Sequence, residues 1–162
     1  MRQWQRLGMM ALVLLLAGGC VSGGSPESRA AEGRGQPPEA APARFTKAAN
    51  GVITDSVTGL EWYLGPDQDN TWRQARDWAA NLAVAGGGWR LPTLAELKVL
   101  YQKGASPINM DPLFQAGGAW VWSGELRNAW SAWGYAFYNG LEGWHHLDYA
   151  KGRVALAVRS RK

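Results

Sequence analysis

Nine of the ten tryptophans in this sequence lie between Trp62 and Trp144. A buried aromatic ring removes about 150–250 Å² from solvent, so a small segment with this many indoles is expected to build much of its core from them. Glycine is also abundant, at 21 of 162 residues, which favours turns and irregular loops over long regular elements. We therefore expect one folded domain over residues 44–162, which is an ordinary domain size.

The N-terminus has the pattern of a secretory signal. Arg2 and Arg6 precede an uninterrupted apolar run over residues 9–17, which is too short for a spanning helix, since that needs about 20 apolar residues. Small residues then lead into Cys20, the single cysteine. This arrangement resembles a bacterial lipobox, in which the cysteine is lipidated and becomes the first mature residue. We expect a lipoprotein signal peptide over residues 1–19. The alternative is an ordinary secretory signal cleaved near a cysteine.

The stretch that follows, residues 20–43, is expected to be a disordered tether. It has no aromatic residue and only one large aliphatic one, Val21, so it cannot bury enough surface to offset its ordering entropy. Val21, rather than an aspartate, follows the cysteine, and by resemblance to Gram-negative lipoproteins this favours the outer membrane. Removing Arg2 and Arg6 leaves 15 basic against 13 acidic residues, a net charge of +2. This balance does not suggest a nucleic-acid partner.

The remaining sequence predicts an α+β fold with two helices packed on irregular antiparallel strands. Apolar residues recur at helical spacing after Asn70 or Thr71, either of which can cap the helix, and Thr93 with Glu96 forms a capping box. Asn139-Gly140 predicts a type I′ turn. The expected elements are strands over 51–55 and 58–63, helices from Thr71 to the glycines at 86–88 and from Leu94 to Lys103, a loop over 106–118, strands over 120–123, 135–138 and 141–147, and a half-buried strand over 154–159.

Several short motifs match one known family. The most specific is the run Trp89-Arg90-Leu91-Pro92-Thr93 followed by Glu96-Leu97, and it is accompanied by Thr58-Gly59-Leu60-Glu61-Trp62, Thr71-Trp72, Trp122-Ser123 and Val158-Arg159. Together these resemble the Lcl C-terminal domain family over residues 51–159. The resemblance implies a fold similar to C-type-lectin-like and sulfatase-modifying-factor domains. It also implies a secreted or lipid-anchored protein, and some members of the family bind sulfated or other polysaccharides.

The motif residues are interpreted as structural. Arg90 is expected to pair with an acidic or carbonyl partner inside the fold rather than with a ligand, and Glu96 is explained by helix capping. The tryptophans stand at the apolar positions of the motif, as core residues do. The residues assigned structural roles are Trp62, Trp72, Trp89, Arg90, Pro92, Glu96 and Trp122.

Two aromatic and polar clusters outside the motif are the candidates for ligand binding. Residues 125–133 are expected to join two strands as a loop. Aromatic faces beside amides and charges can hold sugar rings, because CH groups stack on the rings while polar groups bind hydroxyls. The alternative is that Trp130 and Trp133 pack under this loop. The candidate residues are Arg127, Asn128, Trp130, Trp133, Trp144, His145, Asp148 and Tyr149.

No catalytic or metal-binding motif accompanies these clusters. On a strand, His145 and His146 point to opposite faces and cannot chelate one metal together. Glu125, Glu142 and Asp148 could supply a glycosidase-like carboxylate pair, but the sequence does not set their separation. HExxH and phosphate-loop motifs are absent, as are the calcium-binding triplets of sugar-binding C-type lectins.

The sequence as a whole therefore predicts a lipid-anchored module of the bacterial envelope that is not an enzyme and has no cofactor. We expect it to bind a polysaccharide through tryptophan-rich loops without calcium. The alternative is a structural or assembly subunit that docks on another envelope protein.

Overall fold

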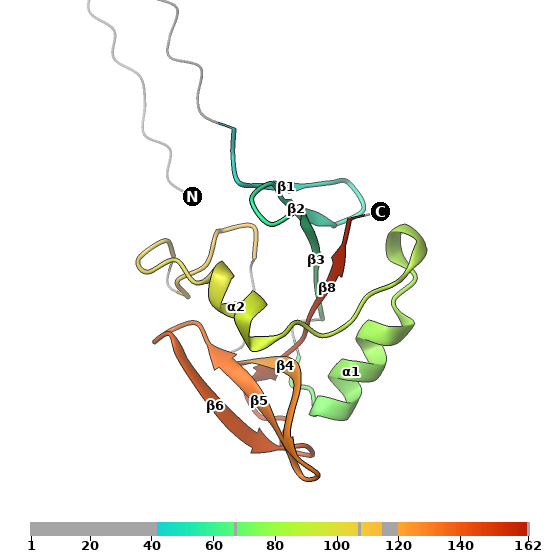
Figure 1. Cartoon of the computed structure of the whole chain (residues 1–162), viewed down its shortest axis with the longest axis vertical. Coiled ribbons are helices and arrows are strands. Elements are labelled where there is room, and N and C mark those ends of the chain that lie inside the picture. Colours follow the sequence, from blue (N-terminus) through green and yellow to red (C-terminus); the bar gives the residue numbers. More distant parts are fainter. Residues whose placement is uncertain (1–41, 67, 107, 115–119, 162) are drawn as a thin grey trace, which may run out of the picture. The chain divides into compact units, whose positions relative to one another are not determined.

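The computed structural model describes residues 42–66, 68–106, 108–114 and 120–161 of the chain, and these form two sheets and two α-helices (Figure 1). The predicted signal peptide, Cys20 and the tether up to residue 41 lie outside the described residues. No helix in the described ranges is long and apolar enough to span a membrane. The elements are β1 (Phe45–Lys47), β2 (Ile53–Asp55), β3 (Leu60–Leu64), α1 (Trp72–Asn81), a 3₁₀ turn (Val84–Gly86), α2 (Leu94–Leu100), β4 (Trp120–Asn128), β5 (Ser131–Ala136), β6 (Leu141–His146), β7 (Arg153–Val154) and β8 (Leu156–Ser160).

The strands are divided between two four-stranded sheets. The first has the order β1-β2-β3-β8, and β8 pairs antiparallel with β3 so that Trp62 lies opposite Val158. The second has the order β6-β5-β4-β7, and it contains a parallel pair, β4 with β7. The α+β class is confirmed. The expectation of purely antiparallel strands was wrong at β7, because the short β7 follows a turn that returns the chain along β4.

The core has two clusters of buried side chains that meet at β8. Leu156 and Val158 of β8 belong to one cluster, while Ala157 of β8 and Ala155, which directly precedes this strand, belong to the other. Alternate residues of a strand point to opposite faces, so both faces of β8 are covered. The expected half-buried last strand was therefore wrong, since residues 153–159 are all buried.

Both helices begin at the expected capping residues. Thr71 forms a capping box with Gln74, and Thr93 forms one with Glu96. The helices end earlier than predicted, at Asn81 and Leu100, well before the glycines. The residues that follow, Leu82 and Tyr101, adopt extended backbone and pack partly buried against the two core clusters. Burial of these two side chains decides where each helix stops.

The β4–β5 hairpin differs most from the sequence prediction. Residues 125–128 continue β4 and Ser131 already begins β5, so only Ala129 and Trp130 form the turn. The predicted nine-residue loop was wrong, because the polar residues of this segment lie on strands that extend into solvent.

The turn between β5 and β6 also differs from its prediction. A type I′ turn needs positive φ at two residues, and here Gly140 has φ 74° whereas Asn139 does not have positive φ. The Asn139 side-chain oxygen instead accepts a hydrogen bond from the Leu141 backbone N–H at 3.2 Å.

Candidate functional site

An aromatic and cationic surface lies on one face of the β4–β5–β6 sheet. Trp133 of β5 is directly opposite Trp144 of β6, and opposed residues of antiparallel strands share one face. The guanidinium carbon of Arg127, on β4, lies 4.0 Å from the ring centroid of Trp144. We call these three residues the aromatic platform.

The platform is exposed because the helix that covers this sheet face does not reach it. Tyr135 lies on the same face as Trp133 and is only 4% exposed, since it packs edge to face with Tyr101 at the end of α2, 6.1 Å between ring centroids. Two residues earlier on β5, Trp133 is half-buried, and its neighbour Trp144 is 49% exposed. Figure 1 shows β4 and β5 running past α2 to their hairpin turn.

Trp130 lies at the tip of that hairpin turn. It is 68% exposed, so the alternative that it packs under a loop was wrong. The turn is held by Asn128, whose side-chain oxygen accepts hydrogen bonds from the Trp130 backbone N–H and from the Ser131 hydroxyl, both at 2.9 Å. Asn128 therefore orders the turn that presents Trp130.

The opposite face of the same sheet carries a separate cluster around His145. Its imidazole lies edge to face against Trp120, with 4.8 Å between centroids, and stacks with Tyr149 at 6.2 Å. The Arg153 guanidinium lies 2.8 Å from His145 Nδ1. Burial, and then the Arg153 charge, lower the pKa of His145. The neutral imidazole accepts the Arg153 hydrogen bond at Nδ1.

Two opposed glycines make room for this cluster. Gly134 and Gly143 face each other across β5 and β6, and a Cβ at Gly143 would lie 2.8 Å from the Trp120 ring. Trp120 and Arg153 were missed as site residues by the sequence analysis. The two glycines, within strands rich in tryptophan, were the available signal.

The eight candidate ligand residues are therefore not brought together. Arg127, Trp133 and Trp144 share the platform face, while His145 and Tyr149 belong to the other face. Asp148 follows β6, exposed, with its carboxylate 3.6 Å from Arg73 and from the His146 imidazole. Of the other carboxylates considered, Glu142 forms a 2.6 Å ion pair with Lys98. Within the ranges that the structure describes, no group of three or more His, Cys, Asp or Glu residues could hold a metal ion.

The motif residues lie in and around the core. Arg90 forms a bidentate ion pair with Glu96, at 2.7 and 2.8 Å, and Glu96 also accepts the Thr93 backbone N–H. The hydrogen bond from Arg90 is the main cause that lowers the pKa of Glu96, against burial, which raises it. The buried motif residues are Trp62, Trp72, Trp89, Pro92 and Trp122.

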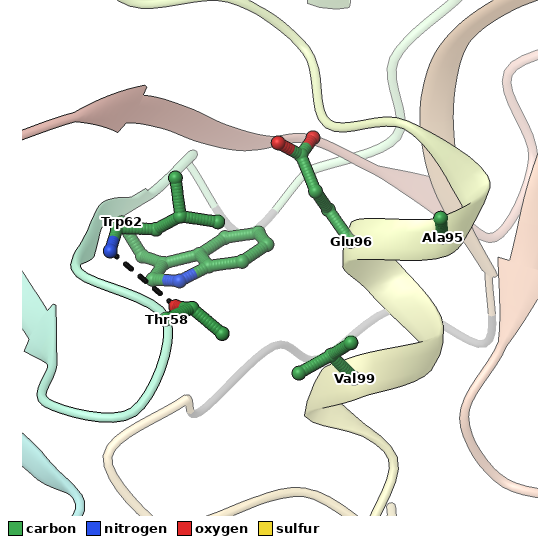
Figure 2. A pocket seen from close by; sticks show the side chains of 6 residues that line it. Thr58, Trp62, Ala95, Glu96 and Val99 are labelled. Carbon is green, nitrogen blue, oxygen red and sulfur yellow. Dashed lines mark hydrogen bonds between the residues drawn. The ribbon is translucent and has the colours of Figure 1, made fainter.

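A pocket of about 170 Å³ lies between β3 and α2 (Figure 2). Its walls are almost entirely apolar. Trp62 is a buried residue of the pocket wall. Two other lining residues, Thr58 and Val99, are exposed, so the pocket is accessible from solvent. From the sequence, Thr58, Leu60, Trp62 and Glu96 were interpreted only as motif residues, and Ala95 and Val99 were given no role. The lining residues are Thr58, Leu60, Trp62, Ala95, Glu96 and Val99.

A comparison with models of known protein families found a match for this chain. The family model described as the Lcl C-terminal domain matches residues 51–159. The matched range contains the aromatic platform, the His145 cluster and the pocket. The comparison with curated proteins found no match.

Proposed function

Because the chain belongs to the Lcl C-terminal domain family, we propose that it is a non-catalytic binding module of the bacterial envelope that recognises a polysaccharide through its aromatic platform. The observation that carries this proposal is the cross-strand pair of the half-buried Trp133 and the exposed Trp144, with the Arg127 guanidinium 4.0 Å from the Trp144 ring centroid. A sugar ring can stack its CH groups on an exposed indole, and the guanidinium can donate hydrogen bonds to hydroxyl or anionic oxygens.

The platform has the composition of a binding hot spot. Tryptophan, tyrosine and arginine are the residues most enriched where binding energy concentrates. Arg127 is held over Trp144 by a cation–π contact, which fixes its side chain before a ligand arrives. This arrangement reduces the entropy that binding must overcome.

The cellular context of the proposal comes from the sequence. The apolar run before Cys20 and the residues around it match a lipoprotein signal, so we place the domain on the outer membrane through a lipid at Cys20. We also propose that the fold is C-type-lectin-like, on the basis of its two helices and its mostly antiparallel sheets. Binding is proposed to be independent of calcium.

The test is a glycan array with the full chain, with and without EDTA, followed by affinity measurements on the best ligand. Trp144→Ala and Arg127→Gln are expected to weaken binding by more than about tenfold, because each removes a contact at the centre of the platform. Tyr138→Ala is the matched control, since Tyr138 is 52% exposed and lies outside the platform. That control is expected to leave the affinity unchanged.

Three outcomes would argue against the proposal. Loss of binding in EDTA would contradict calcium independence. Equal effects of Trp144→Ala and Tyr138→Ala would place the ligand elsewhere. An empty array, together with cross-linking of the lipid-anchored chain to one envelope protein through Trp130 or Trp144, would favour the docking function instead.

A further inference from the structure

The indole of Trp62 differs from the other buried indoles in one respect. The N–H groups of Trp72, Trp89 and Trp122 each donate to a backbone carbonyl at 2.8 Å, from Ser123, Val84 and Asn70 respectively. Trp62 is 1% exposed, yet its Nε1 has no hydrogen-bond partner within the described part of the chain. A buried donor without an acceptor is costly, and buried tryptophans usually avoid it.

This unpaired donor belongs to a residue that lines the pocket between β3 and α2. Figure 2 shows the Trp62 ring on one side of the pocket and Glu96 and Val99 of α2 on the other, with the indole nitrogen on the ring edge nearest Thr58. The pocket volume, about 170 Å³, is similar to that of engineered cavities that hold a benzene-sized group.

The other polar side chains of the pocket already have partners. The Thr58 hydroxyl donates to Asp55 at 2.8 Å and accepts the Leu60 backbone N–H at 3.3 Å. The Glu96 carboxylate is bound by Arg90 and by the Thr93 backbone N–H. Among the described side chains that line the pocket, only the buried Trp62 N–H therefore lacks a partner. A ligand that carries an apolar group beside one acceptor oxygen would fill the pocket and reach this N–H after a small shift of the pocket wall.

The charges near the pocket select a neutral ligand. Glu96 lines it and Asp55 accepts the hydrogen bond of Thr58, but Arg90 and Arg44 already pair with these two carboxylates, so the described side chains of the pocket carry no unpaired charge to attract an ion. A cation would offer no acceptor to the indole N–H. A neutral acyl amide satisfies all of these requirements, because its methyl group is apolar and its carbonyl oxygen is a good acceptor.

We propose that this pocket binds the acetamido group of an N-acetylated ligand. The methyl group packs against Leu60, Ala95 and Val99, and the carbonyl oxygen accepts the hydrogen bond of Trp62 Nε1. The proposal does not depend on the aromatic platform, which lies on a different sheet. The acetamido group can come from an N-acetylated sugar or from another small amide, and the experiment separates these two sources.

The experiment follows the indole N–H resonances of the full chain by NMR during titration with N-methylacetamide, N-acetylglucosamine and glucosamine. The Trp62 resonance is assigned with Trp62→Phe. N-methylacetamide is expected to shift that resonance downfield with a dissociation constant on the order of 1 mM or weaker, given its few non-hydrogen atoms. If the ligand is an N-acetylated sugar, N-acetylglucosamine binds more tightly than N-methylacetamide, whereas equal or weaker binding indicates another amide. Glucosamine, which lacks the acetyl group, is expected to leave the resonance unmoved.

A second variant keeps the test valid if Trp62→Phe does not fold. Ala95→Leu places a larger side chain into the pocket from the surface of α2, and it is expected to perturb the Trp62 resonance and to weaken amide binding at least tenfold. Ala80→Leu, the same exchange at an exposed position of α1, is the matched control and should bind as the wild type does. The proposal would be overturned if N-methylacetamide does not shift the Trp62 resonance, or if glucosamine shifts it as much as N-methylacetamide does. Unchanged binding in Ala95→Leu would overturn it as well.

Discussion

Arg44 holds the fully buried carboxylate of Asp55 in a bidentate ion pair, with Nε 2.9 Å from Oδ1 and Nη2 2.7 Å from Oδ2. The same carboxylate accepts the Thr58 hydroxyl at 2.8 Å and the Val57 backbone N–H at 3.0 Å. These contacts join β1 to the turn before β3. Burial alone would raise the pKa of Asp55, but the hydrogen bonds from Arg44, Thr58 and Val57 outweigh it and lower the pKa to about 2.

This lowered pKa predicts a loss of stability in acid. The unfolded chain binds the proton near the ordinary aspartate pKa of about 3.9, whereas the folded chain binds it only near 2. The stabilisation, about 2.5 kcal/mol, is therefore present above pH 4 and is lost as the pH falls towards 2. Urea unfolding as a function of pH measures this, and Asp55→Asn should flatten the curve in that range. Asp77→Asn, at an exposed aspartate, is the control. If this variant flattens the pH dependence as much as Asp55→Asn does, the loss of stability in acid does not come from Asp55.

The packing of Trp120 on the two opposed glycines predicts a specific steric conflict. In Gly143→Ala the new methyl group would lie 2.8 Å from the Trp120 ring, which is confined by His145 and by Gly134. We expect a loss of about 1–3 kcal/mol in the free energy of unfolding, as is usual for overpacking. In a Trp120→Leu background the same substitution should cost much less, and this coupling is measured by a double-mutant cycle. Additive effects would show that the ring does not rest on Gly143.

The lowered pKa of His145 predicts a second pH effect, in a different range. Burial and the nearby Arg153 charge disfavour its protonation in the folded state, so the unfolded chain takes up the proton first. Stability from this group is present above the ordinary histidine pKa of about 6.5. It decreases as the pH falls from there through the folded-state pKa. An NMR titration, with the signal assigned by His145→Gln, should give a midpoint below 6.5. A midpoint at or above this value would contradict the burial of His145 and its contact with Arg153.

Local signals in the sequence predicted the local features well. Both helix starts were found because the capping threonines and their partners lie within three residues of each other, and such bonds depend little on the rest of the fold. The helix ends were missed because Leu82 and Tyr101 leave the helix to pack against core clusters formed by distant segments. The strand β1 was also missed. Its three residues are too few to give a strand pattern in the sequence, and the strand is stabilised by its pairing with β2 and by the Arg44–Asp55 ion pair.

The candidate site shows the same division. Composition identified the region rich in tryptophan, arginine and histidine, but it could not separate the two faces of the β4–β5–β6 sheet. That separation depends on strand register, since a shift of one residue exchanges the faces. The predicted loop over 125–133 concealed this register, and with it the pairing of Trp133 with Trp144.

The family, the α+β class and the capped helix starts could be predicted from the sequence, because they follow from short motifs and local hydrogen bonds. Tertiary packing sets which indoles of the described residues are buried, which lie on the platform, and which one has an unpaired N–H beside a pocket. These properties depend on contacts between segments far apart in the chain. Trp62 and Trp122 are both buried motif tryptophans, but only Trp122 finds a carbonyl, that of Asn70, within reach.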